Sequence, residues 1–248
     1  MSALRNIWAV FLREMGSYFL SPAAYVVLFL FLATHGAIFY VSVLQRTGDP
    51  WQVTSIVDDV FGFALVWVLF LSPLVTMKLF AEERRTGSFE VLMTAPVTEW
   101  QVVAGKFLAA QAFYFLVWLG LLPLFGMLQV LGNPDWGPIF ATYCGLFFLG
   151  ALTNALGILA STLTRNQLVS AMLALAGNLF FFLLSILERF FPEDPDARRF
   201  IHYVSFTRHF AVDFSNGVID PRYLFFYAGF AALFLFLSVR SLEARKWL

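Results

Sequence analysis

The chain has few charged residues and a single cysteine, and both shortages exclude classes of protein. Charged residues occupy 13% of the 248 positions, whereas about a quarter is usual in a soluble domain. Hydrophobic residues reach 60%. Because Cys144 has no second cysteine to pair with, neither a disulfide framework nor a cysteine-based metal site is possible within one chain. The composition indicates a membrane protein.

Long uncharged runs divide the chain into candidate membrane spans. A hydrocarbon core about 30 Å thick is crossed by roughly 20 helical residues. The runs are continuously apolar instead of alternating, which favours helices over a barrel. We therefore predict an all-α integral membrane protein, a single transmembrane domain over 1–248 with six spans at 22–44, 60–80, 107–131, 139–164, 166–187 and 223–240.

The first twenty residues predict a helix on the membrane surface and no cleavable targeting sequence. Apolar residues recur there at steps of three and four, while Arg5, Asn6, Arg13 and Glu14 fall off that face. The apolar positions are Leu4, Ile7, Trp8, Phe11, Leu12, Met15 and Phe19. This pattern favours an amphipathic interfacial helix over 1–20, and the alternative is a frayed tail.

The distribution of charge predicts the orientation. Six spans put both termini on one side, where ten Lys and Arg stand against six Asp and Glu. The other side has six basic and ten acidic residues. Because short cytoplasmic loops are enriched in Lys and Arg, both termini are expected in the cytoplasm, which fits a bacterial inner membrane.

A charged segment at 81–105 separates the second and third spans. The second span continues past Lys78 through helix-compatible Glu82–Arg85, and Thr86-Gly87 is expected to break the helix. Ser88 can cap a second short helix that ends at Ala95-Pro96. Its apolar side chains would dock on the membrane domain or fill a groove in a partner.

This segment resembles the cytoplasmic segment of permease subunits of type 2 ABC exporters. The resemblance rests on Phe80–Leu92, Pro96 and Gly105-Lys106-Phe107. Asn216–Asp220 and Arg240–Trp247 further resemble the branch that includes gliding-motility-associated permeases. The likeness covers the chain in the number and order of spans and in loop sizes.

The resemblance implies that a coupling helix in this segment sits in a cleft of a separate ATPase subunit. The coupling positions it implies are Glu82, Glu83, Arg84, Arg85, Gly87, Ser88, Phe89 and Glu90. It also implies a second permease copy or paralogue, with ATP and Mg bound by the ATPase. The chain itself lacks a phosphate-binding loop, since Trp100 and Phe107 stand where Gly-x-x-x-x-Gly-Lys-Ser/Thr requires Gly and a hydroxyl.

The segment 188–222 carries aromatic residues at intervals of four, namely Phe206, Phe210 and Phe214. Related permeases have short helices that dip into the outer leaflet here, and a helix resting on the surface is the alternative. An auxiliary outer subunit is a further expected partner. No nucleic-acid partner is expected.

Polar residues within the spans are sparse and expected to face protein or water. Ser170, Ala174 and Asn178 form one strip at steps of four. With Ser72, Thr76 and Asn154, they predict a dimer seam or translocation path, and internal packing is the alternative. His35 has no second ligand near it in sequence and indicates packing, not a haem or metal site.

Together these features predict a permease subunit that moves substrate by alternating access, driven by a separate ATPase. A haem-export permease and a non-transporting subunit that relays ATPase motion to an outer complex are the alternatives.

Overall fold

The computed structural model describes residues 3–46, 53–88, 96–132, 134–187, 205 and 209–244. Within these residues it has helices and no strand. Six helical stretches are long and apolar enough to cross a membrane, which confirms the predicted all-α fold with six spans. The stretches are Pro22–Gln45, Ser55–Thr86, Glu99–Val130, Trp136–Leu163, Gln167–Leu184 and Pro221–Ala244.

Two of the six spans consist of helices stacked end to end, and the other four are single helices. The second span joins α3 (Val53–Gly62), α4 (Ala64–Thr76) and α5 (Lys78–Thr86). The third joins α7 (Glu99–Leu119) and α8 (Leu122–Leu131). The single helices are α2 (Pro22–Arg46), α9 (Trp136–Leu163), α10 (Gln167–Leu187) and α13 (Pro221–Ala244).

The second and third spans are longer than their uncharged runs. Residues 81–86 and 99–105, which the sequence assigned to the charged segment, extend α5 and α7. Hydropathy marks where charge begins, whereas helical hydrogen bonding continues until a stop signal or cap. Thr98 begins α7 with a capping box, in which its side chain and that of Gln101 accept from each other's backbone N–H.

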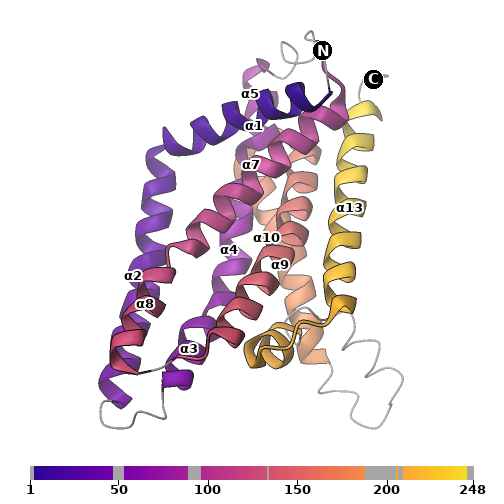
Figure 1. Cartoon of the computed structure of the whole chain (residues 1–248). Helices are drawn as coiled ribbons and strands as arrows, with labels where there is room; N and C mark the ends of the chain where they lie inside the picture. Colours follow the sequence, from indigo (N-terminus) through magenta and orange to yellow (C-terminus); the bar gives the residue numbers. More distant parts are fainter. Residues whose placement is uncertain are drawn as a thin grey trace.

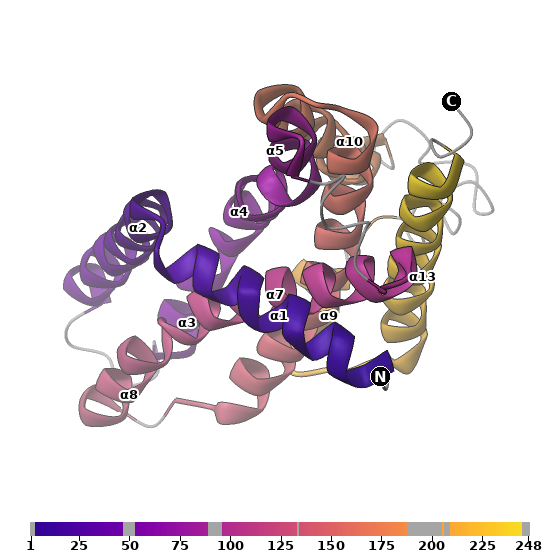
Figure 2. The same cartoon turned by 90° about the horizontal axis from the view of Figure 1, so that it is seen from above.

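The spans run up and down, so that the start of α1 and the end of α13 lie at the same end of the bundle (Figure 1). We call this the N/C end. The tips of α5 and α7 lie there too. Helix α9 contacts α13, α10, α4 and α7, and Figure 2 shows α2 standing to one side of this group. The core is therefore organised around α9.

Glycines let the neighbouring helices approach α9 closely. A Cβ atom built on Gly157 would clash with Thr76 Oγ1 of α4, and one on Gly150 with the Tyr114 ring of α7. Small residues at such crossings are typical of helix contacts in membranes, because they allow extensive van der Waals packing.

Helix α1 (Ala3–Phe19) lies across the N/C end and packs against α7 (Figures 1 and 2). A Cβ built on Gly105 would lie 2.7 Å from Val10 Cβ, so the absent side chain sets this close contact. The interfacial helix is thus part of the folded domain. Its exposed apolar side chains, including Leu4 and Trp8, are those that an interfacial helix presents to a bilayer.

One side of α1 faces the protein. Val10, Glu14 and Tyr18 are its buried residues, whereas Leu12 is exposed. Glu14, which the periodicity places off the apolar face, thus lies on the side of α1 that faces the protein. Ion pairing, described below, makes burial of this carboxylate possible, and a sequence periodicity does not reveal such a partner.

The segment before α13 folds back onto α9 at the end opposite the N/C end. It contains a π-helical turn, η3 (His209–Asp213), and a 3₁₀ turn, η4 (Phe214–Asn216). Phe210 and Phe214 are buried, and a Cβ on Gly145 of α9 would lie 2.8 Å from the Phe214 ring. In this part the aromatic residues pack within the protein. Phe206 and 188–204 lie outside the described residues.

Candidate functional site

Helix α5 carries the charged sequence to the N/C end. It ends at Thr86, because Gly87 adopts a left-handed conformation (φ 74°) that favours glycine. Arg84 and Arg85 occupy the last turn, where cations stabilise the negative end of the helix dipole. The predicted break at Thr86-Gly87 is confirmed.

The predicted coupling residues that the structure describes are Glu82, Glu83 and Arg84 in the body of α5 and Arg85, Gly87 and Ser88 at its tip. Arg85, Gly87 and Ser88 are exposed at the tip of α5. Glu83 and Arg84 instead contact neighbouring helices, and Arg84 Nη1 donates to the Thr162 carbonyl at the end of α9. Phe89, Glu90 and the predicted helix after Ser88 lie outside the described residues. The tip is thus accessible while the body of α5 is held to the bundle.

The helical ladder is interrupted between α4 and α5. Met77 N–H donates to Pro73 C=O, the last such bond of α4, yet Met77 keeps helical backbone angles (φ −53°, ψ −36°). The axis therefore continues although bonds are missing. Pro73 itself lacks an N–H and sits inside α4. We call this feature the α4–α5 break.

Side chains from two other helices satisfy backbone groups at the α4–α5 break. Tyr18 of α1 donates its hydroxyl to Val75 C=O at 2.8 Å. Ser161 Oγ of α9 accepts from the N–H groups of Phe80 (3.0 Å) and Ala81 (3.1 Å). Such partners are needed because unsatisfied backbone groups cost several kcal/mol in lipid. They also fix the break to α1 and α9.

Four charged side chains join α1, α5 and α7. Lys106 Nζ of α7 lies 3.0 Å from both Glu14 Oε1 and Glu83 Oε1, and it donates to Leu79 C=O at 2.6 Å. Arg13 Nη2 lies 2.5 Å from Glu14 Oε1 and 2.6 Å from Glu83 Oε1. Arg13, Glu14, Glu83 and Lys106 form what we call the ion cluster.

Burial makes the ion cluster energetically important. Lys106 has no exposed side-chain surface. Burial alone would raise the pKa of the Glu14 carboxyl, but the charges and hydrogen bonds of Lys106 and Arg13 outweigh it and hold that pKa below its ordinary value. Removing one partner of such a buried group is costly, because the remaining charge is left uncompensated. The cluster therefore couples the positions of three helices.

The sequence interpretation missed Lys106 as a functional residue. It treated Gly105-Lys106 as part of a family motif and as one positive charge among ten on that side. A signal was present, however: Lys106 lies between Val102-Val103 and Phe107-Leu108, so a helix must bury it or find it an acidic partner. Which acid that would be depends on the tertiary fold.

The predicted polar residues of the spans are buried inside the single chain. Ser170, Ala174 and Asn178 of α10 have no exposed surface, and the same holds for Ser72 and Thr76 of α4 and Asn154 of α9. Asn178 Nδ2 donates to Leu69 C=O across the α10–α4 contact at 3.4 Å. In this conformation these side chains pack within one chain, and a dimer seam or translocation path at these positions stays a prediction.

Two further polar groups in the spans are packed. Asn154 Nδ2 donates to Gln111 Oε1 at 3.0 Å, and Gln111 Nε2 donates to Phe147 C=O at 2.8 Å, which joins α9 to α7. His35 Nδ1 donates to Phe31 C=O at 2.9 Å, and its ring lies among the rings of Phe31, Trp67 and Trp118. His35 is therefore part of the aromatic packing of α2 against α4 and α7.

Fold and site together define a polytopic α-helical membrane protein with a charged helix extending from its second span. A family described as ABC-2 family transporter protein matches residues 57–215, more than half of the chain. The chain belongs to this family and is a membrane permease component of an ABC transporter, not its ATPase. A search of curated proteins found no match. Membership implies association with ABC ATPase subunits.

Proposed function

We propose that this chain moves cargo across the membrane by alternating access, in a complex with a second permease copy or paralogue and two ATPase subunits. ATP and Mg bind to the ATPase subunits. The observation that carries the proposal is the division of α5, whose tip at Arg85, Gly87 and Ser88 is exposed while Glu83 and Arg84 are tied to the bundle. An exposed tip offers a docking surface, and the contacts of Glu83 and Arg84 connect a partner docked there to the membrane spans.

In this proposal the N/C end faces the cytoplasm of a bacterial cell, where the ATPase subunits have access to ATP. The excess of Lys and Arg over Asp and Glu on that side supports the orientation. The exposed charges of the α5 tip and the apolar Phe89 that follows it give the mixture of polar and aromatic groups expected at an interface.

Movement of α5 would be transmitted to the spans through three connections. The ion cluster joins α5 to α1 and α7, Arg84 and Ser161 join it to α9, and the chain itself joins it to α4. The α4–α5 break is a position where the second span can bend, because side-chain contacts already replace part of its backbone hydrogen bonding. Closure of the two ATPase subunits would thus tilt α5 and rearrange the helices around α9.

The proposed branch of the family rests on two segments that flank the last span. Asn216–Asp220 and Arg240–Trp247 support a place in the gliding-motility-associated branch, with an auxiliary outer subunit as a partner. Transport and force relay differ in one measurable respect. A transporter has a continuous path through the dimer that opens to each side in turn, and a flux assay with the reconstituted complex detects it.

The docking role is tested by replacing Phe89 and Glu90 together with Ala. We expect the double variant to lose copurification with the ATPase subunit and stimulation of ATP hydrolysis, because it removes an apolar anchor and a charge next to the exposed tip. Arg240→Gln is a matched control, since this charge is at the N/C end of α13 and pairs only with Glu243 among the described residues. Coupling equal to that of the control would remove the segment from this role.

A further inference from the structure

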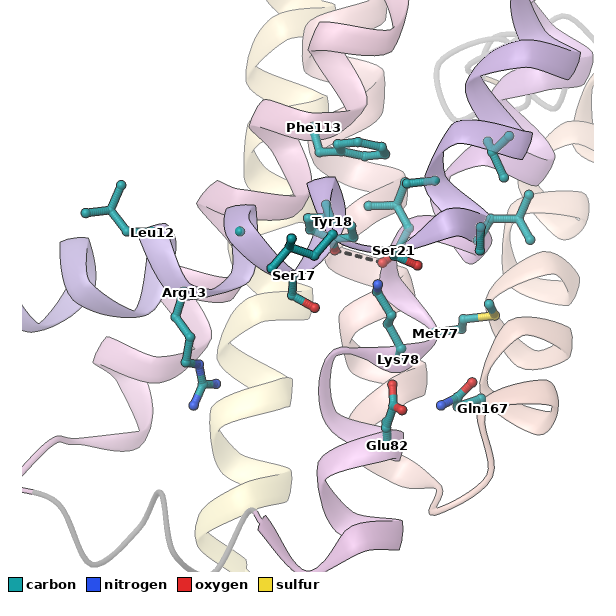
Figure 3. A pocket seen from close by; sticks show the side chains of 17 residues that line it. Leu12, Arg13, Ser17, Tyr18, Ser21, Met77, Lys78, Glu82, Phe113 and Gln167 are labelled. Atoms are coloured by element: carbon teal, nitrogen blue, oxygen red, sulfur yellow. Dashed lines mark hydrogen bonds between the residues drawn. The ribbon is translucent and has the colours of Figure 1, made fainter.

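A cavity of about 820 Å³ lies at the N/C end, beneath the turn between α1 and α2. Figure 3 shows the side chains around it, which come from α1, α2, α4, α5, Phe113 of α7 and Gln167 at the start of α10. Its volume falls within the roughly 300–1,000 Å³ of small-molecule sites. We call it the α1–α5 cavity.

The charges in this cavity differ in how well they are paired. Arg13 is paired with Glu14 and Glu83 of the ion cluster. Lys78 and Glu82, one turn apart on α5, have no ion pair within 4.0 Å among the described residues, and both line the cavity (Figure 3). Lys78 Nζ rests 4.9 Å from the centre of the Tyr18 ring. The cavity therefore contains one cation and one anion, a helical turn apart, that are available to pair with a ligand.

The remaining walls of the cavity suit an amphiphile. Ser17 and Ser21 add hydroxyl groups, and Val27, Leu74 and Phe113 add apolar surface. The cavity lies beside a surface helix whose exposed apolar side chains indicate the depth of the lipid headgroups. A ligand with a charged head and hydrocarbon chains can satisfy both kinds of wall at this depth.

We propose that the α1–α5 cavity binds the headgroup of an aminophospholipid from the adjacent leaflet. The phosphate lies on Lys78, and the primary ammonium donates to the Glu82 carboxylate. A primary ammonium fits better than a quaternary one, since only the former donates hydrogen bonds to the acid. The acyl chains follow the apolar wall between α2 and α4. Glu82, one of the coupling positions implied by the family resemblance, lines this cavity, and the inference does not require ATPase docking.

The site lies at the α4–α5 break. Tyr18 contributes its ring to the cavity and its hydroxyl to Val75 C=O, and both Val75 and Met77 line the cavity. A bound headgroup therefore contacts the residues that hold the break together. Lipid occupancy then stabilises the present conformation of the α4–α5 break relative to others, because a ligand favours the conformation that it binds best.

The test measures lipid retained by the purified full chain in native mass spectrometry, with phosphatidylethanolamine, phosphatidylcholine or phosphatidylglycerol as the probe. We expect the wild type to retain one phosphatidylethanolamine in preference to the other two. Lys78→Gln should weaken retention on the order of tenfold for loss of one charged contact. Glu82→Gln should remove the preference over phosphatidylglycerol. Retention by both variants equal to that of Arg240→Gln would overturn the proposal.

A second variant covers the case in which changes on α5 disturb folding. Gly16 lines the cavity, and a Cβ built on it meets no atom within 4 Å, so Gly16→Leu adds a bulky side chain to the cavity wall at a position with room for its Cβ. Gly229→Leu is the matched control on α13, where a Cβ also meets nothing. We expect only Gly16→Leu to abolish lipid retention. Equal retention by the two leucine variants would contradict the site, whereas ATPase docking would stand unaffected.

Discussion

At the scale of residues, Lys106 has the greatest effect on how the N/C end is built. It is a fully buried cation that meets two carboxylates and a backbone carbonyl from two other helices. Attraction in a poorly solvated site offsets the loss of hydration only when every partner is present. Glu83, implied as an ATPase-docking residue by family resemblance, has a second role here as an internal tie.

Replacing Lys106 with Gln should lower the free energy of unfolding by about 3 kcal/mol or more, because Glu14 and Glu83 then share only Arg13. Unfolding in mixed micelles measures the change. Arg240→Gln breaks an exposed pair with Glu243 and should cost less than about 1 kcal/mol. If the two variants unfold alike, the ion cluster does not hold the helices together.

The ion cluster should also make stability depend on pH. The pKa of Glu14 in the folded protein lies below its ordinary value, so ionised Glu14 contributes stability above the unfolded pKa of about 4.3. That contribution is lost as the pH falls through the lower, folded pKa. Thermal unfolding of Glu14→Gln should show a weaker dependence on pH below about 4 than the wild type. If the stability of the wild type and of Glu14→Gln falls in the same way at acidic pH, Glu14 is not stabilised by its partners.

At the scale of elements, the contacts of α9 depend on glycines that leave room for α4 and α7. Gly157 faces Thr76, which donates to Ser72 C=O within its own helix at 2.8 Å. There is no space for even one methyl group at this crossing. The α4–α9 contact is therefore a rigid support directly below the α4–α5 break.

Gly157→Ala should destabilise the protein by about 1–3 kcal/mol through overpacking. Elsewhere in a helix, the same change is favourable by roughly 0.5–1 kcal/mol. Gly126→Ala on α8, where a Cβ meets nothing within 4 Å, provides the comparison and should be neutral or stabilising. Thermal unfolding of both variants in detergent measures the difference. A neutral Gly157→Ala would mean that α4 and α9 are further apart than described here.

The sequence predicts some elements better than others for a physical reason. The bilayer imposes length and apolarity on every span, so α2, α9 and α13 could be read from hydropathy. Gly87 ends α5 through a local conformational preference, which is also readable. The burial of Glu14 and the acceptor role of Ser161 depend on partners far away in sequence, which no local pattern contains.

At the scale of the whole molecule, the bundle is centred on α9, and α5 extends from it with its base held by neighbouring helices and its tip exposed. The family membership supplies the ATPase partner, and the geometry supplies a path from the tip to the spans. Lys106 of the ion cluster, and Tyr18 and Ser161 at the α4–α5 break, are places where that path can be cut without touching the docking surface.

The most direct test of this account is the location of Ser88. In a Cys144→Ala background, we would introduce Ser88→Cys at the exposed tip of α5 and, separately, Val218→Cys at the opposite end of the bundle. We predict that Ser88→Cys forms a cross-link with the ATPase subunit and resists membrane-impermeant maleimide added outside intact cells, while Val218→Cys reacts with that reagent. Labelling of Ser88→Cys from outside the cell, with no cross-link to the ATPase, would contradict the account.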